Sequence, residues 1–155
     1  MFTIDRTLEI DAPVETVWAV LTDFSRYGEW NPFVPEARCE LRPGGALEMQ
    51  VKLRGEQGKS QFQREWVNAV TPGRSFSYSM KPVPLGTLRS LRVQTLHPLD
   101  DGRTRYVSHF EIDGWLQPLV ARSFGAGMRS GFEGMALGLK RQAEALHRQQ
   151  AGGTR

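Results

Sequence analysis

The chain has 155 residues, of which 39% are apolar and 24% are charged, and its formal net charge is +3. This length and balance are typical of one globular domain with a substantial core. The basic residues are scattered rather than clustered and no apolar run approaches the ~20 residues of a membrane span, so neither nucleic-acid binding nor membrane insertion is expected.

The N-terminal part predicts a strand followed by two short helices. Residues 2–10 alternate apolar and polar side chains, the pattern of a strand with one buried face. Pro13 suits the first turn of a helix, and an apolar stripe at helical spacing follows it. Asp23 can cap a second short helix, which the Asn31-Pro32 pair would end.

Three successive hairpins are expected next. In each, two alternating segments flank a turn rich in glycine, proline or aspartate. The paired segments are 37–41 with 47–53, 62–70 with 76–80, and 88–96 with 104–112. Together with the first strand they predict one strongly curved antiparallel sheet of seven strands.

The last element is a predicted helix from Pro118 to about residue 148, long enough at ~1.5 Å per residue to lie across the whole sheet. Its pattern includes five glycines. Gly131 and Gly138 either allow close packing or leave empty volume above the sheet. We expect residues 1–150 to form a single domain and 151–155 to be a disordered tail.

Two features bear on the cellular compartment. A single cysteine, Cys39, excludes a disulfide within the chain and is typical of a reducing environment. The N-terminal residues begin a strand pattern and lack the basic and apolar regions of an export signal. We therefore expect a cytoplasmic protein, and the sequence leaves a homodimer open.

Several motifs point to a known family. Ala12-Pro13 opens the first helix, the segment 21–33 ends in Trp30-Asn31-Pro32-Phe33, and Asp113-Gly114 precedes the last helix. With the order of elements, these residues resemble the START/Bet v 1-like superfamily (SRPBCC), and within it the bacterial polyketide cyclase/dehydrase-like group. The resemblance implies an α+β helix-grip fold, with the sheet wrapped around the C-terminal helix and a cavity for a hydrophobic ligand.

Polar side chains can be sorted by face, because successive residues of a strand point to opposite sides. If the apolar register of each strand faces inward, every strand carboxylate and both strand histidines face outward; these are Asp5, Glu9, Glu40, Glu48, Glu65, Glu111, His97 and His109. Proton-transfer enzymes mostly use His or carboxylates, so the pattern disfavours catalysis and indicates no catalytic residue. It also predicts no metal site, and no glycine-rich phosphate loop indicates a cofactor.

Inward-facing arginines are the sharper signal. Arg64 and Arg92 lie in mid-strand among apolar residues, and an unpaired buried guanidinium is costly. If Leu96 pairs with Tyr106, then Arg92, Gln94 and Ser108 form one polar patch suited to a carboxylate or carbonyl head group. Alternatively, the arginines reach water at the cavity mouth or pair with an acid on a helix.

We therefore predict non-covalent binding of a small hydrophobic or amphipathic ligand, such as a lipid or a polyketide-like aromatic. The segment 81–86 and the Trp30–Phe33 turn are candidates for the cavity rim. The candidate ligand-contacting residues are Trp30, Phe33, Met49, Phe62, Arg64, Trp66, Tyr78, Arg92, Gln94, Tyr106, Ser108, Phe110, Phe124, Met128, Gly131 and Met135.

Two other functions stay open. The first is a cofactor-free cyclase, aromatase or dehydratase that holds a reactive chain in a folded shape, with Arg92, Tyr78 or Tyr106 polarising a carbonyl. Asp23, Glu29 or Glu133, on helices, could then supply a carboxylate. The second is a protein-interaction module in which side chains fill the cavity.

Overall fold

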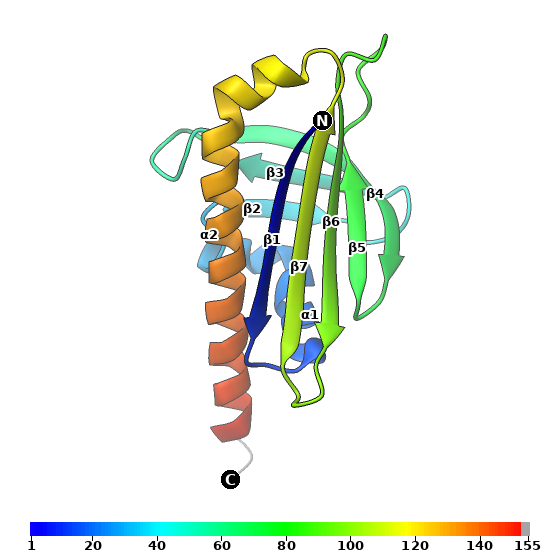
Figure 1. Cartoon of the computed structure of the whole chain (residues 1–155). Coiled ribbons are helices and arrows are strands. Elements are labelled where there is room, and N and C mark those ends of the chain that lie inside the picture. Colours follow the sequence, from blue (N-terminus) through cyan, green and yellow to red (C-terminus); the bar gives the residue numbers. More distant parts are fainter. Residues whose placement is uncertain (153–155) are drawn as a thin grey trace.

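A long helix packs against a seven-stranded sheet in the computed structural model of the protein, which describes residues 1–152 (Figure 1). In chain order the elements are β1 (Phe2–Ile10), α1 (Val14–Thr22), the 3₁₀ helix η1 (Phe24–Glu29), β2 (Glu36–Cys39), β3 (Ala46–Val51), β4 (Gln61–Thr71), β5 (Ser75–Ser79), β6 (Arg89–Pro98), β7 (Thr104–Asp113) and α2 (Gln117–Gly152). This is the α+β helix-grip fold expected from the sequence.

The sheet is antiparallel throughout, in the order β1-β7-β6-β5-β4-β3-β2. Its strands therefore follow the chain as a meander, except that β1 joins the far edge beside β7. In the β6–β7 hairpin, Leu96 pairs with Tyr106 and Arg92 pairs with Phe110, which confirms the register expected from the sequence. That register aims the Arg92 side chain at the inner face.

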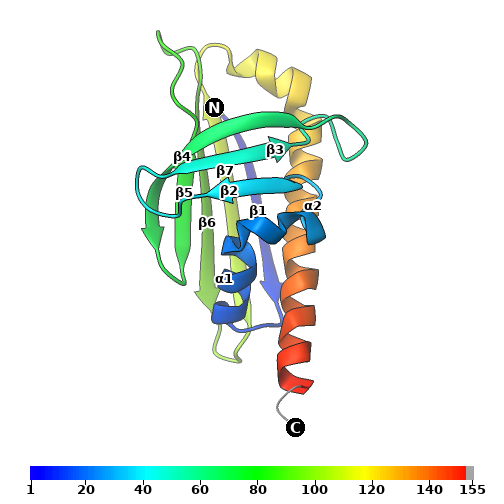
Figure 2. The same cartoon turned by 180° about the vertical axis from the view of Figure 1, so that it is seen from behind.

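The sheet bends so that β2 and β3 cross over the face on which α1 lies (Figure 2). Helix α1 contacts both β6 and α2, and η1 contacts β2, so the two short helices close one end of the space between sheet and helix. Buried side chains of α2, including Met128, Phe132 and Met135, face this space. The opposite end is bordered by connecting segments.

Strand β4 departs from the sequence-based expectation. Its ladder with β5 is interrupted between Val67 and Ala69, which is a β-bulge that places one extra residue in β4. Before the bulge, Glu65 pairs with Leu47 and shares the inner face with it. The inward register expected for this strand was therefore wrong over residues 62–66, because a shift of one residue exchanges the two faces.

The glycines of α2 serve close packing. A Cβ atom at Gly131 would overlap the ring of Phe33, and one at Gly138 would overlap the carbonyl oxygen of Trp30. The segment before β2 thus lies directly against the helix, and these positions hold no empty volume. The helix also includes Ala151 and Gly152, two residues of the tail that the sequence predicts to be disordered. The rest of that predicted tail lies outside the described residues.

Candidate functional site

A cavity of about 360 Å³ lies between the inner face of the sheet and α2. It is within the size range of small-molecule sites. Its wall is mostly aliphatic, aromatic and thioether side chains. The lining residues are Phe33, Val34, Met49, Val51, Leu53, Gln63, Glu65, Tyr78, Met80, Leu88, Ser90, Arg92, Phe110, Ile112, Val120, Phe124, Met128, Phe132 and Met135.

The cavity has a buried end and a more accessible end. Arg92, Tyr78 and Met135 are among the buried lining residues. Leu53, Val120 and other partly exposed lining residues belong to the ends of elements or to the connections between them. We call this accessible end the cavity mouth, and it lies away from α1.

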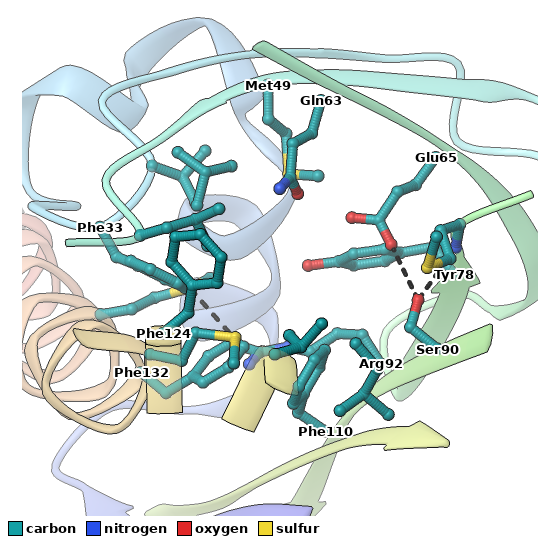
Figure 3. Close-up of a pocket in the computed structure, with 18 of the residues that line it drawn as sticks. Phe33, Met49, Gln63, Glu65, Tyr78, Ser90, Arg92, Phe110, Phe124 and Phe132 are labelled. Atoms are coloured by element: carbon teal, nitrogen blue, oxygen red, sulfur yellow. Dashed lines mark hydrogen bonds between the residues drawn. The ribbon is translucent and has the colours of Figure 1, made fainter. Parts of the chain in front are cut away.

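Arg92 is the permanent charge of the cavity and is only 2% exposed. Its Nη2 atom donates hydrogen bonds to the Tyr106 hydroxyl at 3.4 Å and to the Met135 sulfur at 3.5 Å. Its guanidinium carbon lies 4.1 Å from the centroid of the Phe132 ring, a cation–π contact. The Nε and Nη1 atoms are buried without a hydrogen-bond partner among the described residues (Figure 3).

Unsatisfied buried donors are rare in folded proteins, and those of a charged group are especially costly. Arg92 does not reach water, so for this residue the alternative of a solvated arginine at the cavity mouth is wrong. Arg64 does reach water, but on the outer face of β4 and not at the cavity mouth; its side chain is 52% exposed and lies 3.4 Å from Glu48. Pairing with a helix acid, the other alternative, occurs at Arg6, which forms an ion pair with Glu133.

The remainder of the predicted polar patch lies outside the cavity. Gln94 and Ser108 pair in the β6–β7 ladder and are each 1% exposed, yet neither lines the cavity. The Tyr106 hydroxyl donates to Gln94 Oε1 at 2.6 Å while it accepts from Arg92. These three residues form a hydrogen-bonded support behind Arg92, and burial raises the pKa of Tyr106.

Glu65 lines the cavity, although the sequence pattern placed it on the outer face. Burial raises the pKa of its carboxyl group to about 7, and the positive charge of Arg92 partly opposes that rise. Ser90 Oγ accepts a hydrogen bond from the Met80 amide at 3.1 Å and donates to Glu65 Oε1 at 3.5 Å. Figure 3 shows Glu65 beside Ser90, whereas the guanidinium group of Arg92 lies against Phe132.

A signal of this arrangement was present in the sequence. Val67 and Val70 are both apolar but three residues apart, so a regular strand cannot turn both inward. A bulge between them resolves the conflict, and it turns Glu65 inward with Val67. Gln63, one further step along the same face, also lines the cavity.

The predicted site residues divide into two groups. Half of them line the cavity: Phe33, Met49, Tyr78, Arg92, Phe110, Phe124, Met128 and Met135. The other half do not: Trp30, Phe62, Arg64, Trp66, Gln94, Tyr106, Ser108 and Gly131.

The residues that miss the cavity do so for different reasons. Phe62, Arg64 and Trp66 belong to the misassigned register of β4, and Phe62 is 55% exposed. Trp30 packs against Tyr27, with ring centroids 4.9 Å apart, and Gly131 is covered by Phe33. No sequence signal distinguished these packing roles from a role in the cavity wall.

Two features of the described residues concern metals and membranes. Within residues 1–152, no group of three or more His, Cys, Asp or Glu side chains could hold a metal ion. Across the same residues, no helix is both long and apolar enough to cross a membrane. The polar and charged side chains that line the cavity are those of Arg92, Glu65, Ser90, Gln63 and Tyr78.

The curved sheet, the long helix and the cavity between them define a helix-grip protein with an internal site. The family model described as polyketide cyclase / dehydrase and lipid transport matches residues 1–149, and the chain belongs to that family. A comparison with curated proteins finds no match.

Solved structures share the fold at low sequence identity. A START superfamily protein from Mycobacterium smegmatis is 20% identical, with a TM-score of 0.69 over 93% of this chain and 98% of that one. The aromatase/cyclase Zhui from Streptomyces sp. R1128 is 14% identical, with a TM-score of 0.65 over 92% of this chain and 93% of that one. The di-domain ARO/CYC StfQ from the steffimycin biosynthetic pathway is 16% identical, with a TM-score of 0.66 over 97% of this chain and 51% of that one.

Proposed function

We propose that the protein binds an amphipathic small molecule, with a carboxylate or carbonyl head on Arg92 and an apolar body in the cavity. The observation that carries the proposal is the pair of unpartnered Arg92 atoms, Nε and Nη1, among the described residues. Each donor lies beside Nη2, on a different edge of the guanidinium plane, so each can donate a hydrogen bond to an oxygen of a carboxylate or carbonyl group. The apolar wall would accommodate an alkyl chain or a flat ring system.

The family description supports the same class of ligand, since it joins polyketide chemistry with lipid transport. Both kinds of molecule combine a long or flat apolar part with carbonyl or carboxyl groups. Native mass spectrometry of the purified protein, compared with its denatured mass, should reveal a retained ligand of this class.

Isothermal titration with decanoate tests the role of Arg92 directly. We expect Arg92→Met to weaken decanoate binding by about 10- to 100-fold, because a hydrogen bond to a charged group contributes roughly 1.5–3 kcal/mol. Decanol has the same chain without the carboxylate, so its affinity should change little. Arg64→Met, an equal change on the outer face of β4, is the matched control. Unchanged decanoate affinity in Arg92→Met would overturn the proposal.

A second candidate function is cofactor-free proton transfer on a carbonyl compound, as in a cyclisation or a dehydration. The observation that favours it is Glu65, whose pKa of about 7 suits a general acid or base and which shares the cavity with Arg92. Arg92 would polarise the carbonyl oxygen while Glu65 removes a proton from the adjacent carbon.

Deuterium exchange into methyl octyl ketone, followed by proton NMR in deuterium oxide, distinguishes the two functions. A proton-transfer enzyme should accelerate exchange next to the carbonyl, and Glu65→Gln should abolish the acceleration while leaving the ketone bound. Exchange no faster than in buffer, together with measurable ketone binding, would contradict the catalytic candidate and favour a carrier.

A further inference from the structure

Large apolar side chains are exposed together beside the cavity mouth. They lie on the β5–β6 connection, on the segment that leads into α2 and on the first turn of α2, which are at the same end of the molecule (Figure 1). We call these residues the apolar tip: Val83, Leu85, Trp115 and Leu119, with exposed fractions of 38%, 93%, 67% and 59%. Clustered exposed apolar residues of this size commonly mark an interaction site.

Hydrogen bonds to backbone carbonyl groups hold the two segments of the tip together. The Trp115 indole donates to the Leu85 carbonyl at 3.2 Å, and the Trp115 amide donates to the Gly86 carbonyl at 3.2 Å. The Leu116 amide donates to the Thr87 carbonyl at 3.1 Å. The apolar tip is therefore one connected unit.

Leu85 is held in an unfavourable conformation that its own packing does not explain. Its φ angle is 65°, in the left-handed region that a leucine rarely adopts. A strained residue normally gains contacts in return, yet this side chain points almost wholly into solvent. A partner that covers Leu85 would supply the missing contacts.

The surroundings of the tip are basic. Residues 80–88 and 114–132 contain Lys81, Arg122 and Arg129 and no Asp or Glu. Within residues 1–152, neither Lys81 nor Arg122 forms an ion pair. The nearby Asp113 is neutralised by Arg89 at 2.8 Å. The face therefore combines apolar projections with unpaired positive charges.

The tip adjoins the cavity in the chain and in space. Met80 and Leu88, which line the cavity, flank the segment of Val83 and Leu85. Val120, another lining residue, follows Leu119 directly. A surface that covers the apolar tip would therefore also cover the cavity mouth.

We propose that the apolar tip docks this protein onto the surface of an anionic lipid bilayer. Leucine and tryptophan side chains would enter the boundary between head groups and acyl chains, and Lys81 and Arg122 would contact the acidic head groups. A projecting tip with a basic surround suits a deformable bilayer better than a flat protein surface. The proposal does not depend on what the cavity binds.

Vesicle flotation of the whole protein tests this docking. We expect binding to vesicles of phosphatidylcholine with phosphatidylglycerol, and much weaker binding to phosphatidylcholine alone. Leu85→Ser with Trp115→Ser should lower binding at least about tenfold, because apolar burial is lost. The double variant Lys81→Glu with Arg122→Glu should bind anionic and neutral vesicles equally. Added salt should likewise remove the preference of the wild type for anionic vesicles, because it screens the charges.

Matched controls separate docking from general effects. Leu137→Ser changes a leucine that is 41% exposed far along α2, and Arg141→Glu with Arg148→Glu reverses two charges near the other end of that helix. Both should bind as the wild type does, and circular dichroism melting verifies that all variants fold. Absence of wild-type binding to anionic vesicles, or undiminished binding of the tip variants, would overturn the proposal. So would a wild-type dimer that Leu85→Ser dissociates, since a second copy would then cover the tip.

Discussion

Glu65 and Arg92 share one apolar cavity, yet within residues 1–152 no ion pair joins them. Arg92 contributes a positive charge to the cavity wall, whereas Glu65 has a pKa of about 7. The lining residues therefore carry a net positive charge when Glu65 is protonated and no net charge when it is ionised. Proton binding at one residue thus controls how strongly the cavity attracts an anion.

Decanoate affinity should depend on pH through Glu65. Above about pH 6 the ligand is ionised, and ionisation of Glu65 then places a second negative charge in the same low-dielectric space. We expect affinity to fall roughly tenfold between about pH 6 and pH 8.5, measured by isothermal titration. The decanoate affinity of Glu65→Gln should change little with pH. The affinity of the wild type for decanol, which carries no charge, should also change little with pH. An equal fall in Glu65→Gln would contradict this explanation.

The stability of the fold should also change with pH because of Glu65. Its carboxyl has a pKa of about 7 in the folded protein against an ordinary value of 4.5. The folded state therefore binds more protons than the unfolded state within this window, so the free energy of unfolding falls as pH rises through it and stays lower above it. Urea unfolding of the wild type and Glu65→Gln, from about pH 4 to pH 9, should show that the variant lacks this fall.

His109 supplies a comparison for that experiment. Hydrogen bonds to Glu111 and Asp5 raise the pKa of His109 above 6.5, so its stabilising contribution is present at low pH and is lost as pH rises through the folded-state pKa. Because this change has the same sign as that of Glu65, His109→Gln should be measured beside Glu65→Gln. If only His109→Gln flattened the profile, the assignment to Glu65 would be wrong.

Gly131→Ala should destabilise the protein. The new methyl group would overlap the Phe33 ring, and overpacking of this kind costs about 1–3 kcal/mol, more than the ~1 kcal/mol gained in helix propensity. Gly125→Ala, whose methyl would meet only the edge of the Phe2 ring at 3.3 Å, is the control and should be tolerated better. Denaturant unfolding measures both. A more stable Gly131→Ala variant would show that the ring moves aside freely.

Tyr106→Phe should affect stability more than ligand binding. The change removes the hydroxyl that joins Arg92 to Gln94 and leaves buried polar atoms without a partner, which costs roughly 1–3 kcal/mol. Since Tyr106 does not line the cavity, decanoate affinity should fall far less than in Arg92→Met. Tyr78→Phe, which changes a lining residue, provides the comparison. Loss of binding as complete as in Arg92→Met would mean that Tyr106 contacts the ligand.

The overall fold was predictable because each strand pair is bounded by a strong turn signal. Glycine, proline and aspartate turns limit the register, and the pairing of Arg92 with Phe110 followed from the spacing alone. The inward orientation of Arg92 therefore came from local patterns. The sequence could not predict that its Nε and Nη1 atoms lack partners among the described residues. That property depends on where Tyr106, Met135 and Phe132 lie in space.

Strand β4 misled the prediction because apolar character was taken as evidence of burial. Phe62 is aromatic but mostly exposed, where it stacks with Arg64 at 5.7 Å. Glu65 is a carboxylate on the inner face, which the chain tolerates because its pKa is raised and Ser90 donates to it. The candidate site was therefore predicted in its aromatic and basic parts and missed in its acidic part.

The bulge at Val67–Ala69 has a consequence for how this cavity could diverge among related proteins. If the strand kept all its residues but lost the bulge, strict alternation would turn outward either Val70 or the preceding inner-face residues, Val67 and Glu65. In the second case the Glu65 carboxylate would leave the interior, and Arg64 and Trp66 would replace it. Deletion of one residue at the bulge would instead give Val67 and Val70 the spacing of a regular strand and keep Glu65 inside. The irregularity of the backbone, and not the identity of the lining residues, thus decides whether this wall is acidic or basic and aromatic.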